Sequence, residues 1–113
     1  MSRDDATLLD ILKAARLVVE FKGKLTKKAF IRDIKTQSAI LHQLLVIGEA
    51  VKRLSEDFRA RHPKIPWPRI AGMRDKLIHE YDAVDVGEVW KTVTTDIPAL
   101  ISFLEPLVSR DKE

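Results

Sequence analysis

The chain has 113 residues, a length typical of one domain, and we expect residues 1–113 to form a single folded unit. Hydrophobic residues make up 45% of the sequence, which is enough for one modest core. The absence of cysteine excludes a disulfide framework and a thiolate metal site. The three histidines lie far apart and lack the spacing of common zinc sites, so we predict no metal and no other cofactor.

The first residues, Met-Ser-Arg-Asp-Asp, lack the basic start and the apolar run of a signal peptide. No apolar stretch approaches the roughly 20 residues that a membrane helix needs. We therefore expect a soluble, cytoplasmic protein without a membrane partner.

The net charge of +3 conceals an asymmetry along the chain. Residues 1–74 carry 16 basic and eight acidic side chains, whereas residues 75–113 carry four basic and nine acidic ones. A basic surface attracts polyanions in a salt-dependent way. The candidate RNA-binding cluster is made of Lys22, Lys24, Lys27 and Lys28, although a solvated lysine-rich turn explains the same residues equally well.

Two long helices are predicted in the N-terminal half. Apolar periodicity indicates a first helix from Arg3 to Lys22, capped by Ser2 and ended by Gly23. A second helix begins after Thr26 and continues for about 30 residues to Phe58, with a bend or break near Lys35–Gln37 as an alternative. Gly48 lies in its middle, where a glycine often permits close helix contact.

The C-terminal half predicts two further helices. After a loop from Arg59 to Pro66, Trp67-Pro68 opens a third helix that reaches about Glu80. A short connection, Asp82 to Asp85, leads to a fourth helix from Val86 to about Val108, capped by Asp85 and kinked at Pro98. The chain is therefore predicted to be an all-α, up-and-down bundle of four main helices, or five if the second helix breaks. The third helix is too short to cover the first two, which favours a homo-oligomer.

The segment from Arg74 to Tyr81 holds an arginine, a histidine and the only tyrosine of the chain. Arginine grips phosphate with permanent charge, and histidine exchanges protons near neutral pH. At 100° per residue from Ile70, Arg74 falls at about 40° and Tyr81 at about 20°, on the edge of the apolar stripe. His79 falls at about 180°, away from that stripe, with Asp75 one turn before it at about 140°.

This placement leaves His79 as either a solvated surface residue or a residue of a second interface. Asp75, four residues earlier, could orient the imidazole and favour its protonated form. Arg74 and His79 can meet at one phosphate only if the helix end distorts or a second copy contributes.

Several separated motifs occur in order and carry a resemblance to a known family. They are Ile47-Gly48-Glu49-Ala50, Ile65-Pro66-Trp67, Gly72-Met73-Arg74-Asp75 with His79-x-Tyr81, Val84-Asp85, Val89-Trp90 and Asp96-Ile97-Pro98-x-Leu100. The chain resembles the HepT-like ribonuclease toxins, a branch of the HEPN superfamily (higher eukaryotes and prokaryotes nucleotide-binding). The resemblance extends from the first helix to about Leu104.

The resemblance implies a HEPN-like, all-α homodimer whose Arg–His motifs line a cleft between the two subunits. It implies metal-independent RNA cleavage by the toxin of a type II toxin–antitoxin pair, with a tRNA or an mRNA as possible substrate classes. It also implies a partner, a nucleotidyltransferase antitoxin of the MNT type, that silences the toxin by transferring AMP to the motif tyrosine.

By position, the resemblance assigns charge stabilisation on the phosphate to Arg74 and acid–base chemistry at the ribose 2′-hydroxyl to His79. Asp75 occupies the supporting polar position, and Tyr81 becomes the AMP acceptor. Tyr81 could instead only pack its ring at the core edge. Glu49 is interpreted as structural, with Arg74 as its partner, because an unpaired carboxylate in an apolar helix is costly.

Two other functions remain compatible with these residues. One is a binding module that holds a nucleotide or a partner without catalysis. The other is a structural helical dimer in which the motif is incidental. Trp67 and Trp90 are interpreted as core residues rather than as stacking platforms for RNA.

Overall fold

The computed structural model describes residues 3–79 and 84–111, and within these ranges the chain forms helices and no strand. The predicted all-α class is therefore confirmed. In chain order the elements are α1 (Arg3–Lys22), α2 (Lys27–Arg32), α3 (Ile34–Arg53), α4 (Glu56–Arg61), α5 (Trp67–His79), α6 (Val86–Lys91), the π-helical segment η2 (Thr92–Asp96) and α7 (Ile97–Asp111).

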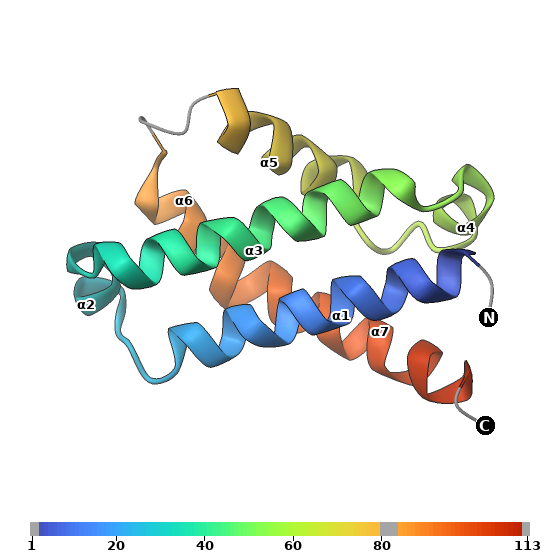
Figure 1. Ribbon diagram of the computed structural model, residues 1–113, viewed down its shortest axis with the longest axis horizontal. Coiled ribbons are helices and arrows are strands. Elements are labelled where there is room, and N and C mark those ends of the chain that lie inside the picture. The colour runs from blue at the N-terminus through green and yellow to red at the C-terminus, as the bar shows by residue number, and fades with distance from the viewer. Residues whose placement is uncertain (1–2, 80–83, 112–113) are drawn as a thin grey trace.

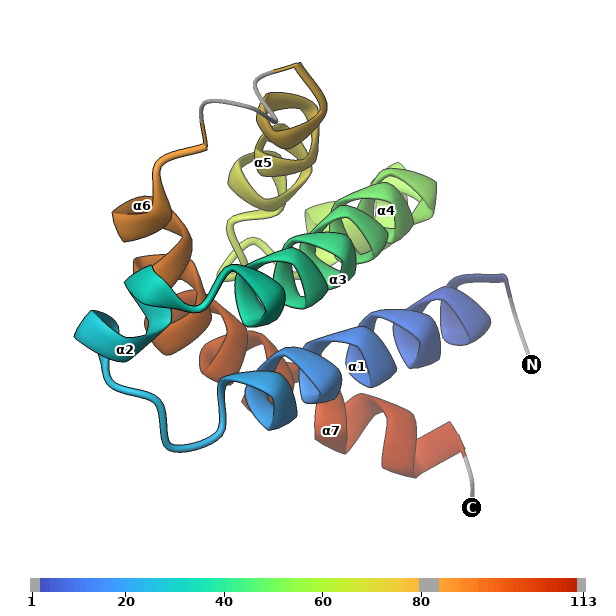
Figure 2. The same ribbon diagram turned by 60° about the vertical axis from the view of Figure 1, so that its left-hand side comes forward.

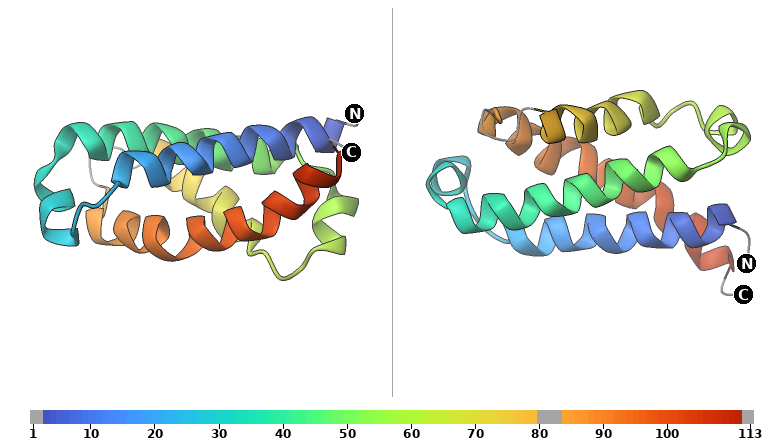
Figure 3. Two further views of the ribbon diagram at one scale, coloured as in Figure 1. Left: turned by 90° about the horizontal axis from the view of Figure 1, so that it is seen from below. Right: turned by 45° about the horizontal axis from the view of Figure 1, so that its top comes forward.

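The long helices form an up-and-down bundle in which successive helices run in opposite directions (Figure 1). Helix α1 packs between α3 and α7, and α3 packs between α1 and α5. Figures 2 and 3 show α5 on the side of α3 that faces away from α1. Within the described residues, no helix combines the length and the apolar character that crossing a membrane requires.

One continuous core joins these layers. Its largest fully buried side chains come from α1, α2, α3, η2 and α7, and they are Ile11, Leu12, Val18, Phe30, Ile40, Ile47, Val51, Val93, Leu100 and Leu104. Helix α5 contributes less to this core, because Trp67 and Leu77 are its only buried residues among those described, and neither is fully buried. It therefore lies on the bundle as an outer element.

The first helix ends where it was predicted to end. Gly23 adopts a φ of +51°, a left-handed conformation that side chains rarely tolerate, and its N–H donates to the carbonyl of Val19 at 2.9 Å. The predicted cap Ser2 lies outside the described residues.

The single helix predicted from Thr26 to Phe58 is wrong, because the chain forms α2, α3 and α4 instead. The first break falls at Asp33, just before the interval considered, where the Asp33 carboxylate accepts the Thr36 N–H at 3.0 Å and caps α3. The second break is capped by Ser55, whose hydroxyl oxygen accepts the Phe58 N–H. The predicted loop also starts later than expected, since α4 continues to Arg61.

The last predicted helix corresponds to three consecutive helical segments, α6, η2 and α7, of which η2 is irregular. Asp85 caps α6 as predicted, by accepting the N–H groups of Gly87 and Glu88. The irregularity expected at Pro98 takes the form of the π-helical turns of η2, directly before the start of α7 at Ile97. Proline cannot donate a backbone hydrogen bond, and a wider turn absorbs such a loss. The helix then extends to Asp111, beyond the predicted end.

Helices α3 and α5 cross at close range at Gly48. A Cβ atom placed on Gly48 would lie 2.2 Å from the Cβ and 3.3 Å from the Cα of Arg74. No real Cβ contact is that short, so the glycine is what allows the two helices to approach. The crossing holds the base of the Arg74 side chain against α3.

We expect Gly48→Ala to lower the free energy of unfolding by roughly 1 to 3 kcal/mol, because the added methyl must push α5 away from α3. Gly72→Ala is the matched control on α5. A Cβ atom added at Gly72 would meet nothing within 4 Å, so alanine should instead stabilise the helix by up to about 1 kcal/mol. Urea unfolding followed by circular dichroism, at one protein concentration, measures both changes. Equal effects of the two substitutions would contradict a tight crossing at Gly48.

Candidate functional site

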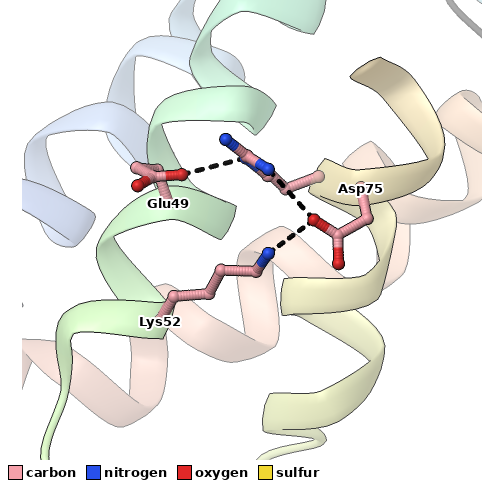
Figure 4. A network of polar contacts seen from close by, with 4 residues as sticks. Glu49, Lys52 and Asp75 are labelled. Atoms are coloured by element: carbon pink, nitrogen blue, oxygen red, sulfur yellow. Dashed lines mark hydrogen bonds and ion pairs between the residues drawn. The ribbon is translucent and has the colours of Figure 1, made fainter. Parts of the chain in front are cut away.

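The side chain of Arg74 is held between two carboxylates at the α3–α5 crossing. Its Nε lies 2.9 Å from Oε2 of Glu49, and its NH1 lies 3.1 Å from Oδ1 of Asp75. Figure 4 shows Glu49 on α3 facing the helix that carries Asp75. Arg74 is half-buried, with 29% of its side chain exposed, so its guanidinium is fixed while one side stays open to solvent. The predicted contact between Glu49 and Arg74 is present.

Lys52 extends this cluster on α3 and was not predicted. Its Nζ forms an ion pair with the same Asp75 oxygen that receives Arg74 (Figure 4). The hydrogen bond from Lys52, and then that from Arg74, hold the pKa of the Asp75 carboxyl below its ordinary value of 3.8. Lys52 comes one helical turn after Gly48, and that spacing was the signal that could have revealed it.

His79 is the last residue of α5 and is exposed. The prediction that it faces away from the core is therefore confirmed. Among the described residues, Asp75 bonds to Lys52 and Arg74 and not to His79, so the proposed orientation of the imidazole by Asp75 is not observed. Because α5 is α-helical from Trp67 to His79, Arg74 and His79 project about 140° apart. One chain does not bring the two side chains together.

A shallow groove of about 340 Å³ lies beside the Arg74 guanidinium. Its walls come from α3 and α5, and they are Leu45, Val46, Glu49, Arg53, Arg74 and Ile78. Apolar side chains and two arginines therefore share one open surface. This α3–α5 groove is the place where a ligand could reach Arg74.

A second cavity, of about 250 Å³, lies on the other flank of α5, towards α6 and η2. Gly72, Met73 and Leu77 form part of its apolar wall, and Lys76 and Lys91 are among its charged residues. None of the predicted catalytic residues lines it. The candidate site is therefore the α3–α5 groove.

The predicted lysine cluster lies elsewhere, at the turn between α1 and α2. Lys24, Lys27 and Lys28 are exposed, whereas Lys22 is half-buried with its Nζ 5.3 Å from the centre of the Trp90 ring. A role of this cluster in RNA binding stays a prediction. Tyr81, the predicted AMP acceptor, lies outside the described residues.

The two tryptophans pack as expected. Trp67 is buried, and its Nε1 donates to the carbonyl of His62 at 2.9 Å. Trp90 is half-buried and packs on Phe30 with ring centres 5.3 Å apart. The described tryptophans therefore stabilise the fold.

The fold and the site define an all-α helical bundle that presents an anchored arginine and an exposed histidine on one helix, and comparison with known proteins identifies the family. A model of the family described as "Ribonuclease HepT-like" matches residues 11–107. The chain belongs to this HepT-like ribonuclease family. Its membership confirms the predicted fold class and the predicted class of enzyme, an RNA endonuclease.

Individual relatives agree with this assignment. The chain is 48% identical over 100 residues to a Thermococcus cleftensis protein named "Probable ribonuclease HepT", covering 88% of this chain and 91% of the relative. It is 40% identical over 103 residues to a Methanocaldococcus jannaschii protein that is named as an RNase, covering 91% of this chain and 85% of the relative. No solved structure matches the chain significantly.

The Lys52–Asp75 contact predicts a change in titration. In Lys52→Met, the pKa of the Asp75 carboxyl should rise towards its ordinary value, because methionine removes the hydrogen bond that is the first cause of its lowering. Asp33 is the internal control, since hydrogen bonds from Thr36 hold its pKa low and Lys52 does not contribute. NMR titration of the side-chain carboxyl carbons measures both groups.

The same shift determines how acid affects stability. A carboxyl with a lowered pKa in the folded state stabilises the fold above its unfolded pKa, and this contribution is lost as the pH falls through the folded value. Asp75→Asn should therefore be less stable than the wild type at neutral pH, with the difference shrinking below about pH 4. A difference that stays constant down to pH 2 would contradict the assignment.

Proposed function

We propose that the chain is a metal-independent endoribonuclease toxin that acts as a homodimer in the cytoplasm, with Arg74 of one subunit and His79 of the other meeting at one RNA phosphate. The observation that carries this proposal is the geometry of α5, which anchors Arg74 against α3 and projects the exposed His79 about 140° away. Each subunit then holds half of a site. A two-fold axis near α5 would complete two such sites at once.

The chemistry follows from the two side chains. His79 takes the proton of a ribose 2′-hydroxyl, and the oxygen attacks the adjacent phosphorus. The bond from phosphorus to the 5′-oxygen breaks, and this leaving oxygen receives the proton that the His79 imidazolium has taken from the 2′-hydroxyl. The products are a 2′,3′-cyclic phosphate and a 5′-hydroxyl. Arg74 stabilises the charge that develops on the phosphoryl oxygens, and Glu49 and Asp75 keep its guanidinium in position.

The regulatory half of the proposal concerns Tyr81. In this proposal a nucleotidyltransferase antitoxin of the MNT type transfers AMP to the Tyr81 hydroxyl. The modification adds a negative charge and a bulky group seven residues after Arg74, and both oppose the entry of an RNA phosphate.

Catalysis is tested with purified protein, structured and unstructured RNAs, and a chelator. His79→Ala should lower the cleavage rate by about 10²- to 10⁴-fold, and Arg74→Gln by about 10²- to 10³-fold. Glutamine keeps the aliphatic stem that packs on Gly48, so circular dichroism should show both variants folded. The new RNA ends should carry 2′,3′-cyclic phosphates. RNA binding without any cleavage by the wild type would instead support the alternative, a binding module without catalysis.

A mixed dimer tests whether the two subunits share each site. Differently tagged Arg74→Gln and His79→Ala subunits are co-expressed, and the heterodimer is purified through both tags. Such a dimer retains one intact pair, so it should recover roughly half of the wild-type rate, although each parent homodimer is inactive. An inactive heterodimer would show that each site takes both residues from one chain.

Modification is tested by expressing the chain alone and together with a co-encoded nucleotidyltransferase. Expression alone should arrest growth, and co-expression should relieve the arrest and add at least one AMP unit to the intact mass of the toxin. Fragmentation should place the added mass on the peptide that contains Tyr81. In Tyr81→Phe the mass gain should disappear, and its persistence would refute the assignment to this residue.

A further inference from the structure

The Arg74 cluster contains no net charge. Arg74 and Lys52 supply two positive charges, and Glu49 and Asp75 supply two negative ones, all joined by direct ion pairs. The field of such a neutral group falls off quickly with distance. Arg74 can therefore bind a phosphate that has entered the α3–α5 groove. The neutral cluster, however, attracts a distant RNA strand only weakly.

Arg53 is the charged residue of the α3–α5 groove that is not neutralised in this way. It is the last residue of α3, it is exposed, and it lines the groove together with Arg74. Within the described part of the chain, no carboxylate lies within ion-pair distance of its guanidinium. Glu49, one turn earlier on the same face of α3, is bonded to Arg74 instead.

We propose that Arg53 binds an RNA phosphate next to the one held at Arg74, and so supplies the positive charge that draws RNA into the groove. Arg53 is then a binding and positioning residue, and His79 and Arg74 perform the chemistry. The inference rests on the proposed function, because it names how that site takes up its substrate. The adjoining walls of Leu45, Val46 and Ile78 leave an apolar surface beside the phosphate.

The first test measures binding without cleavage. A fluorescent RNA with 2′-O-methyl groups lacks the nucleophile, so anisotropy reports affinity alone. Arg53→Gln should weaken binding by about tenfold at low salt and reduce the slope of log K against log salt by about 0.7, the value for one phosphate contact on a single strand. Arg53→Lys should retain most of both, because it keeps the charge.

Arg16→Gln is the matched control for loss of one positive charge. Arg16 lies on α1 and pairs with Glu105 of α7, away from the α3–α5 groove. It should leave the affinity and the salt slope nearly unchanged. Equal losses in Arg16→Gln and Arg53→Gln would mean that only total charge matters, and would overturn the proposal.

Cleavage kinetics distinguish a binding role of Arg53 from a structural one, because only a binding role changes KM without changing kcat. Arg53→Gln should raise KM by about the factor that is lost in binding and leave kcat nearly unchanged, whereas His79→Ala lowers kcat. Wild-type KM and salt slope in Arg53→Gln would overturn the inference. So would a change in oligomeric state, measured by light scattering, because Arg53 would then bond across a subunit interface.

Failure of the proposed function looks different. A wild-type protein that binds the methylated RNA but cleaves no RNA would reject the catalytic proposal, and the comparison of Arg53→Gln with Arg16→Gln would still decide the role of Arg53. A wild-type protein that binds no RNA would reject both.

Discussion

The approach of α5 to α3 at Gly48 is the contact on which the candidate site depends. Because Gly48 has no side chain, the Cβ of Arg74 lies directly against α3. The Arg74 guanidinium can then form its ion pair with Glu49, the residue that follows Gly48. A larger residue would clash with the Cβ of Arg74 and force α5 away from α3, because the close-packed contact leaves no room for an added atom. One small residue therefore determines both the packing of the outer helix and the position of the candidate catalytic arginine.

That anchoring has an electrostatic consequence. Exposed ion pairs contribute little to stability, so the two carboxylates around Arg74 are better understood as positioning groups than as stabilising ones. They fix the guanidinium, but their negative charges also weaken the electric field that Arg74 exerts on a distant RNA strand. Geometry and attraction are then the tasks of different residues, since Arg53 keeps an uncompensated charge on the same groove. A site that binds and cleaves a polyanion needs both.

Elements that depend on local chemistry could be predicted from the sequence. Gly23, Trp67-Pro68 and Asp85 mark their helix boundaries through turn and cap chemistry alone. The break after α3 could not be predicted, because Ser55 is also held by Asp4, 51 positions earlier, through bonds of 2.9 and 2.7 Å. No local pattern records such a contact, and a run of apolar residues through Phe58 continued to indicate one helix.

The candidate site divides in the same way. Helical geometry was enough to place His79 off the core, and the cost of an unpaired carboxylate was enough to join Glu49 to Arg74. Lys52 and Arg53 fell inside the single long helix that was predicted there. In the structure they occupy the last turn of α3, where basic side chains interact favourably with the helix dipole in any helix. Their roles depend on how α5 lies across α3, and the crossing is a tertiary property that α3 alone does not specify.

The uncovered apolar surface bears on how half-sites would combine. Ile34 is 75% exposed, and Leu45 lies eleven residues later on nearly the same side of α3, at the edge of the groove. Ile78 continues this surface onto α5, with 46% of its area exposed. Burial of such a surface favours association. In the proposed dimer, a second copy that covered the Ile34 end of this surface would leave Arg53, at the other end of α3, open to RNA, and its own exposed His79 could approach Arg74.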